Sequence, residues 1–161
     1  MTVRSAGILL YRWNTESRLE VWIAHMGGPF WARKTDRSWS IPKGEYPDNE
    51  DPLTAALREF AEEIGTPAPA LDYIPLGAFR QPSGKIITAF AAESDFQPEQ
   101  IVSNTFALEW PKGSGAIRDF PEIDDARWVG EPEARTKLVG GQLPILDALI
   151  AHLSKDNPAP Q

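Results

Sequence analysis

The chain has 161 residues, 42% of them hydrophobic, which suits one globular domain with its own core. Its formal net charge of −7 argues against a general nucleic-acid binder, and the absence of cysteine excludes a disulfide framework. No apolar run is long enough to cross a bilayer, and no signal peptide is evident. We therefore expect a single domain at 1–153 and a frayed tail at 154–161 in a cytoplasmic protein, with no membrane partner and no stable nucleic-acid complex.

Strands are predicted at 3–13 and 19–26, because both segments are rich in β-forming residues and a polar turn separates them. A loop with glycine, proline and four charges follows at 27–38, and a short strand at 39–42 precedes a glycine turn. A helix is predicted from about 51 to 65, since an aspartate and a proline mark its start and a glycine its end.

The second half of the chain alternates strand and helix signals. Strands are predicted at 72–81 and 85–94, joined by a Pro-Ser-Gly turn, and further strands at 105–110 and 126–129. A helix begins near 131–132, and an amphipathic helix is predicted at 144–153.

The predicted helix at 51–65 gathers carboxylates on one face. Glu59, Glu62 and Glu63 are neighbours there, because residues three and four apart share a face. Clustered carboxylates repel one another unless cations neutralise them, and oxygen ligands favour Mg²⁺ or Mn²⁺ over zinc. The alternative is an ordinary solvated face paired with Arg58. An apolar stripe on roughly the opposite side predicts core packing and consists of Leu53, Leu57, Phe60 and Ile64.

The residues around these acids follow a fixed spacing: Gly44, Glu50, Arg58, Glu59, Phe60, Glu62, Glu63 and Gly65. This segment resembles the Nudix box, the signature of the Nudix hydrolase superfamily, at every charged and glycine position. It departs at Thr66, where the family has an aliphatic residue, and Phe60 is bulkier than usual. The order of flanking elements is similar to the Nudix fold, an α/β architecture with a mixed sheet sandwiched between helices.

The resemblance implies an enzyme that cleaves a diphosphate linkage with water and Mg²⁺ or Mn²⁺. Arg58 would orient the carboxylates, and Glu50 would anchor the loop to the helix. The implied metal ligands are Glu59, Glu62, Glu63 and the backbone carbonyl of Lys43 or Gly44.

A further carboxylate is expected from the segment before the strand at 126–129. Many Nudix enzymes carry a glutamate a few residues before a Trp-Val strand, and Glu122 resembles it. We prefer Glu122 as an additional metal ligand to Asp124, to Asp125 and to the alternative that these are ordinary carboxylates of an exposed loop. Either Glu59 or Glu122 would accept the proton of the attacking water.

The substrate is predicted from a second similarity. Arg4 and the run at 39–44 look similar to segments of diadenosine polyphosphate hydrolases of the Nudix group, which favours a nucleoside or dinucleoside polyphosphate. Trp31 and Trp39 border the loop beside the box and are candidate stacking surfaces for a base. The predicted substrate contacts are Arg4, Trp39, Lys43 and Arg80, and a basic cluster at Arg33, Lys34, Arg37 and Lys43 either assists them or faces water.

Two alternatives stay open. One is an enzyme for ADP-ribose, a sugar nucleotide or an RNA end; Pro82 lies near a proline typical of ADP-ribose hydrolases of the family, although a turn explains it equally well. The other is a non-catalytic module that senses a nucleotide. The intact acidic set argues against the sensor.

Overall fold

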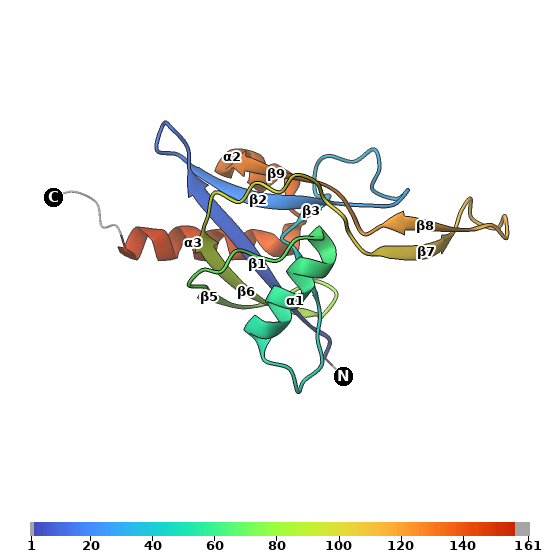
Figure 1. Ribbon diagram of the computed structural model, residues 1–161, viewed down its shortest axis with the longest axis horizontal. Helices are drawn as coiled ribbons and strands as arrows, with labels where there is room; N and C mark the ends of the chain where they lie inside the picture. Colours follow the sequence, from blue (N-terminus) through green and yellow to red (C-terminus); the bar gives the residue numbers. More distant parts are fainter. Residues whose placement is uncertain (1, 157–161) are drawn as a thin grey trace.

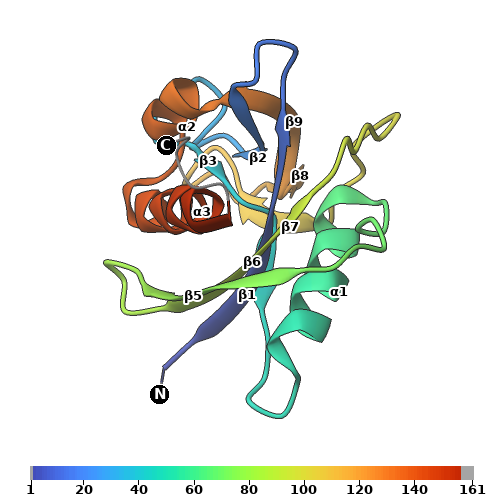
Figure 2. The ribbon, with the colours of Figure 1, turned by 90° about the vertical axis from the view of Figure 1, so that its left-hand side faces the viewer.

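The computed structural model describes residues 2–156, arranged in three layers (Figure 1). A mixed seven-stranded sheet lies between helix α1 (Pro52–Ile64) on one face and helices α2 (Glu131–Lys137) and α3 (Leu143–Asp156) on the other (Figure 2). This arrangement confirms the predicted α/β architecture. No helix within the described residues is long and apolar enough to span a membrane.

The central strand of the sheet is β1, which pairs in parallel with β6 along one edge and antiparallel with β4 and then β2 along the other. The sheet order is β3-β2-β1-β6-β5, with β9 pairing β2. Its strands are β1 (Arg4–Trp13), β2 (Leu19–Met26), β3 (Trp39–Ser40), β4 (Lys43–Glu45), β5 (Ile74–Arg80), β6 (Ile86–Glu93) and β9 (Ile123–Gly130).

Strand β1 shows why both faces are covered. Successive side chains of a strand point to opposite faces, and here both sets are apolar. Leu9 and Tyr11 pack in the core beneath α2 and α3, whereas Ala6, Ile8 and Leu10 pack in the core beneath α1. Because both of its faces are buried, β1 lies in the middle of the molecule. Strand β4 is held in place by pairing with β1.

Helix α1 has the limits that its sequence predicts. The Asp51 side chain accepts a hydrogen bond from the Thr54 N–H at 3.0 Å, Pro52 follows in the first turn, and Gly65 ends the helix at φ 84°. Phe60 and Ile64 of the predicted apolar stripe are fully buried against the sheet. The opposite face is left free to carry the acids.

Replacing Asp51 by alanine removes this cap. We expect the free energy of unfolding to fall by about 1 kcal/mol, the usual cost of losing an N-cap side chain. Urea denaturation measures the change, and Asp48→Ala is the matched control because that side chain is 84% exposed and makes only a long ion pair. Equal effects of the two substitutions would show that the cap contributes nothing.

Segments 39–45 and 105–121 differ from the prediction. The short strand predicted at 39–42 is divided between β3 and β4. The strand predicted at 105–110 is β7 (Thr105–Glu109), and it forms a separate hairpin with the unpredicted β8 (Ile117–Pro121). The β8 sequence, Ile-Arg-Asp-Phe-Pro, lacks an alternating pattern and ends in proline, so only pairing with β7 makes it a strand.

The C-terminal helix is longer than predicted. Helix α3 continues to Asp156, beyond the predicted end at 153, after a short 3-10 helix (Gly140–Gln142). The remainder of the predicted tail, 157–161, lies outside the described residues.

Candidate active site

The acidic face of α1 lies against strand β4. Gly44 pairs with Ala6 of β1, and a methyl group on Gly44 would overlap the Glu59 carboxylate. The glycine thus allows a carboxylate of the helix to approach the β4 backbone closely. On the same helix face, the Lys43 N–H donates to Glu63 Oε2 at 3.1 Å. Two carboxylates of α1 are therefore positioned against the β4 backbone.

Desolvation acts on the carboxylates of this face. Burial raises the pKa of Glu63 to about 8; the Lys43 N–H and charge oppose the shift, and the charges of Glu122 and Glu59 add to it. Burial also raises the pKa of Glu59, and the neighbouring Arg58 opposes that shift. Carboxylates held partly out of water with raised pKa are sites where a cation is favourable.

Glu122 lies close enough to the box to interact with it. It sits between β8 and β9, and burial raises its pKa, with the Glu62 charge contributing. The charge of Glu122 in turn contributes to the raised pKa of Glu59 and of Glu63. The tertiary structure therefore brings Glu122 within electrostatic range of the three carboxylates of α1, which lie in a distant part of the chain.

The donor set fits a hard divalent cation, because it consists of carboxylate and carbonyl oxygens that repel one another without one. Within residues 2–156, however, no three Asp, Glu, His or Cys side chains converge tightly enough to form a preassembled metal site. Glu59 and Glu62 bond to Arg58, and Glu63 accepts a hydrogen bond from Lys43. Sharing one ion among three carboxylates thus requires side-chain rotation.

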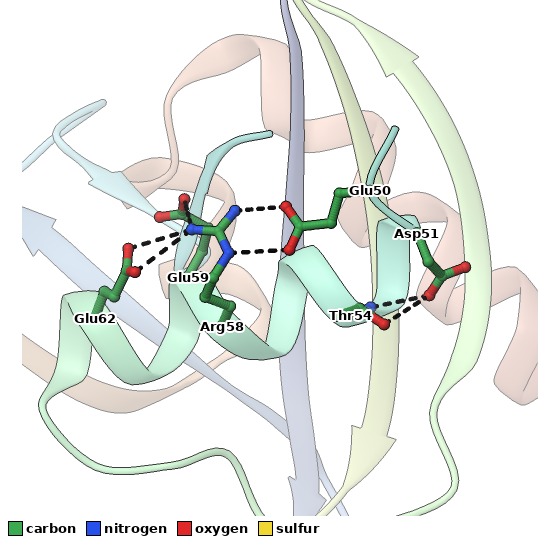
Figure 3. A network of polar contacts seen from close by, with 6 residues as sticks. All are labelled: Glu50, Asp51, Thr54, Arg58, Glu59 and Glu62. Carbon is green, nitrogen blue, oxygen red and sulfur yellow. Dashed lines mark hydrogen bonds and ion pairs between the residues drawn. The ribbon is translucent and has the colours of Figure 1, made fainter. Parts of the chain in front are cut away.

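Arg58 links the loop before α1 to the acidic face (Figure 3). Its guanidinium donates twice to Glu50, at 3.0 and 2.7 Å, and once to Glu59 Oε1 at 2.8 Å, with a longer contact to Glu62 at 3.4 Å. This bidentate bond to Arg58 lowers the pKa of Glu50. The contacts are those expected if Glu50 anchors the loop and Arg58 orients the carboxylates.

The family model of the NUDIX domain matches residues 1–149. The chain belongs to the Nudix family. An RNA pyrophosphohydrolase of Acidiphilium cryptum (strain JF-5) is 30% identical over 122 residues, which cover 73% of this chain and 72% of the relative. The family match and this relative confirm the prediction of a Nudix pyrophosphohydrolase.

Solved structures agree in fold. The Ap4A hydrolase of C. elegans, in a binary complex, superposes with a TM-score of 0.65 at 18% identity, covering 94% of this chain and 98% of the other. The NUDIX domain of Shewanella oneidensis NrtR, complexed with ADP ribose, gives a TM-score of 0.61 at 15% identity, covering 95% and 89%. At these identities the likeness supports the Nudix fold alone.

In this Nudix domain, the predicted substrate contacts Arg4, Lys43 and Arg80 lie on three different strands. Arg4 starts β1 and lines an open hollow with Glu50 of the box loop. The charge of Lys43 reaches Glu63 and Glu122. Arg80 ends β5, two strands from Arg4 in the same row of the sheet, and donates to a carbonyl of its own turn. Arg4 and Lys43 thus lie beside the box, whereas Arg80 lies at the edge of the sheet.

Trp39 is a core residue and not the exposed stacking surface that was predicted. It is only 4% exposed, because pairing of β3 with β2 turns its ring into the core beneath α2 and α3. Its ring meets the His25 ring edge-on at 5.1 Å between centroids. The other candidate, Trp31, is half-buried, with the Lys34 ammonium 5.1 Å from its ring centroid.

A buried histidine near the site was missed. His25 is 6% exposed; its Nδ1 lies 2.6 Å from Asp124 Oδ1, and its Nε2 lies 2.8 Å from the Lys34 carbonyl. It ties the loop at 27–38 to the strand that follows Glu122. Local sequence carries no signal for this contact, since the two partners are 99 positions apart.

Replacing Arg58 by lysine tests the link between loop and acidic face. Lysine keeps the charge but cannot bond Glu50 in a bidentate manner and reach Glu59 at once. We expect kcat to fall about 10- to 100-fold, the usual effect of losing a group that orients metal ligands. Arg135→Lys is the control: Arg135 also bonds two carboxylates, Glu131 and Asp147, but on α2 and α3. An equal fall in kcat in both variants would contradict the role of Arg58 in orienting the carboxylates.

Proposed function

We propose that the chain is a Mg²⁺-dependent hydrolase that cleaves a diphosphate linkage in a nucleoside polyphosphate or dinucleoside polyphosphate; Mn²⁺ is the other candidate ion. The proposal rests on one observation: Glu122, far from α1 in the sequence, lies near enough to Glu59, Glu62 and Glu63 of α1 for the charges to interact. A purely structural acidic face would have no need to recruit a distant carboxylate against the repulsion of three others.

The residues that would hold the ion are Glu59, Glu62, Glu63 and Glu122, with the carbonyl of Gly44. When bound, a divalent cation supplies neutralisation of phosphate oxygens and lowers the pKa of a coordinated water well below its bulk value of about 15.7. Glu59 or Glu122 would accept a proton from the attacking water. Lys43 and Arg4 would bind the phosphates, and Arg58 would keep Glu59 in position through the contact at 2.8 Å.

A nucleotide substrate is supported by the relatives. The C. elegans protein of similar fold is an Ap4A hydrolase, and the similarity of Arg4 and the segment at 39–44 to such enzymes points the same way. The Acidiphilium relative makes an RNA 5′ end the second candidate. The net charge of −7 favours a small nucleotide over a long polyanion. A cytoplasmic location stays a prediction.

A substrate panel tests the proposal. The purified protein is assayed with Mg²⁺ on a dinucleoside tetraphosphate, a nucleoside triphosphate, ADP-ribose and an RNA with a 5′-triphosphate, and the products are identified by chromatography. We expect the dinucleoside or nucleoside polyphosphate to be cleaved with the highest kcat/KM, and chelation of the metal to abolish turnover. Preference for RNA or ADP-ribose would transfer the assignment to that substrate. Thermal stabilisation by a nucleotide without any hydrolysis would identify a sensor.

A further inference from the structure

Two segments outside the box meet at the backbone of Glu122. The Gly27 N–H donates to the Glu122 carbonyl at 2.8 Å, so the loop at 27–38 starts there. The β7–β8 hairpin ends there, and the Glu122 N–H donates to the Asn104 carbonyl at 2.8 Å, just before the hairpin begins. The Asn104 N–H donates to the Glu62 carbonyl at 3.2 Å. Loop and hairpin are therefore joined to the backbone of two glutamates of the site, Glu62 and Glu122.

The loop and the hairpin lie side by side as they leave the site (Figure 1). Gly28, at φ +93°, lies so close to Phe106 that a methyl group there would press on its ring. Further out, the rings of Phe30 and Trp110 meet edge-on, with 5.6 Å between centroids and an angle of 74°. The aromatic pair Phe30–Trp110 thus joins the two segments near the hairpin tip.

Exposed apolar side chains concentrate on these segments. Among the described residues, the three most exposed large hydrophobic side chains are Ile117 at 67%, Phe30 at 61% and Val102 at 56%. All three lie on the loop, on the hairpin or just before it. Trp110 supports the Phe30 ring from one side and leaves most of Phe30 open to a ligand.

The charge of these segments is opposite to that of the whole chain. Residues 27–38 and 105–121 contain five basic and three acidic side chains, in a chain of net charge −7. The basic residues are Arg33, Lys34, Arg37, Lys112 and Arg118. An exposed aromatic ring among cations is suited to a base that carries phosphates, since the ring stacks on the base and the cations attract the anion.

The length of the hairpin restricts the ligand. Strand β7 has five residues, which at the usual rise per residue places Trp110 roughly 17 Å from the hairpin root beside Glu122. A ligand that spans from the carboxylates to the aromatic pair must hold several phosphates between the bond being cut and its base. We propose that Phe30 and Trp110 form a stacking site for one base of a dinucleoside polyphosphate. This inference rests on the proposed function and names the substrate more closely.

Steady-state kinetics of Phe30→Ala test the site. We expect KM for a dinucleoside tetraphosphate to rise about tenfold, the effect of losing one base-aromatic contact, with kcat unchanged. KM for ADP-ribose, whose adenosine is separated from the terminal ribose by only two phosphates, should change less than twofold. Phe30→Tyr should behave as the wild type, and Trp110→Ala should reproduce Phe30→Ala.

The control is Trp13→Ala, which removes a 46% exposed ring at the β1–β2 turn and should leave both KM values unchanged. An equal rise for both substrates, or no rise for the tetraphosphate, overturns the stacking site while the hydrolase assignment stands. If the wild type cleaves neither a nucleoside triphosphate nor the tetraphosphate, the proposed function fails on its own. Where the tetraphosphate is not cleaved, titration calorimetry with it decides the stacking site: tenfold weaker binding by Phe30→Ala supports it, and equal binding overturns it.

Discussion

Glu63→Gln is expected to lower kcat by more than about 100-fold and to leave the fold intact. Losing a group that merely orients a metal ligand costs 10- to 100-fold, so losing a proposed ligand should cost more. Glutamine has the same shape, and its carbonyl can still accept the hydrogen bond from the Lys43 N–H. The measurements are kcat with saturating Mg²⁺, ion binding by calorimetry and the circular dichroism spectrum.

Stability of the metal-free protein gives a second test of the same residue. The pKa of Glu63 is raised by burial, to about 8, so its ionisation opposes folding. The free energy of unfolding should therefore fall as pH rises from about 5 to 8, since the unfolded chain ionises first and the folded one only later. Glu63→Gln should remove this part of the slope. Added Mg²⁺ should oppose it in the wild type by favouring the ionised form.

Glu16→Gln is the matched control, because that carboxylate is 73% exposed and lies on the β1–β2 turn. It should change neither kcat nor the pH dependence of stability. Undiminished turnover of Glu63→Gln, in a protein that still binds Mg²⁺ normally, would contradict the ligand assignment.

Gly44→Ala is expected to lower kcat by about 10- to 100-fold, comparable to the loss of a ligand-orienting group. The added methyl would overlap the end of the Glu59 side chain, which is flexible and can move aside. The backbone therefore keeps its place while the carboxylate is displaced from β4. Activity should fall with little change in the melting temperature.

Gly140→Ala serves as the control for this substitution. Apart from the adjoining backbone, no atom of the described residues lies within 4 Å of a methyl group at Gly140, and its position requires no positive φ. It should retain full activity. If Gly44→Ala is equally active, the close approach of Glu59 to the β4 backbone has no part in catalysis.

Local interactions explain why the box could be predicted so closely. The helix is bounded by a cap at Asp51 and a glycine at Gly65, and its faces follow from contacts three and four residues apart. The contact between Arg58 and Glu50 is also local, because the two residues are only eight positions apart in the sequence. Pairing of β1 with β2 and of β5 with β6 also follows from short turns.

Residues far apart in the chain account for what could not be predicted. The Trp39 ring could stack on a base if it were exposed, but pairing of β3 with β2 buries it. His25 meets Asp124 only because β2 pairs with β9. Strand β8 forms by pairing with β7, where Phe120 lies opposite Phe106. The five residues of β8 do not by themselves specify this pairing.

The sequence by itself determined the Nudix family, the helix and its acidic face, because spacing and capping act over a few residues. The family resemblance predicted Glu122 beside that face, whereas only the tertiary structure decided that Trp39 is core and that an aromatic pair lies at the far end of a hairpin rooted at the site. Those outcomes depend on strand pairing and burial between distant segments, which no local pattern specifies.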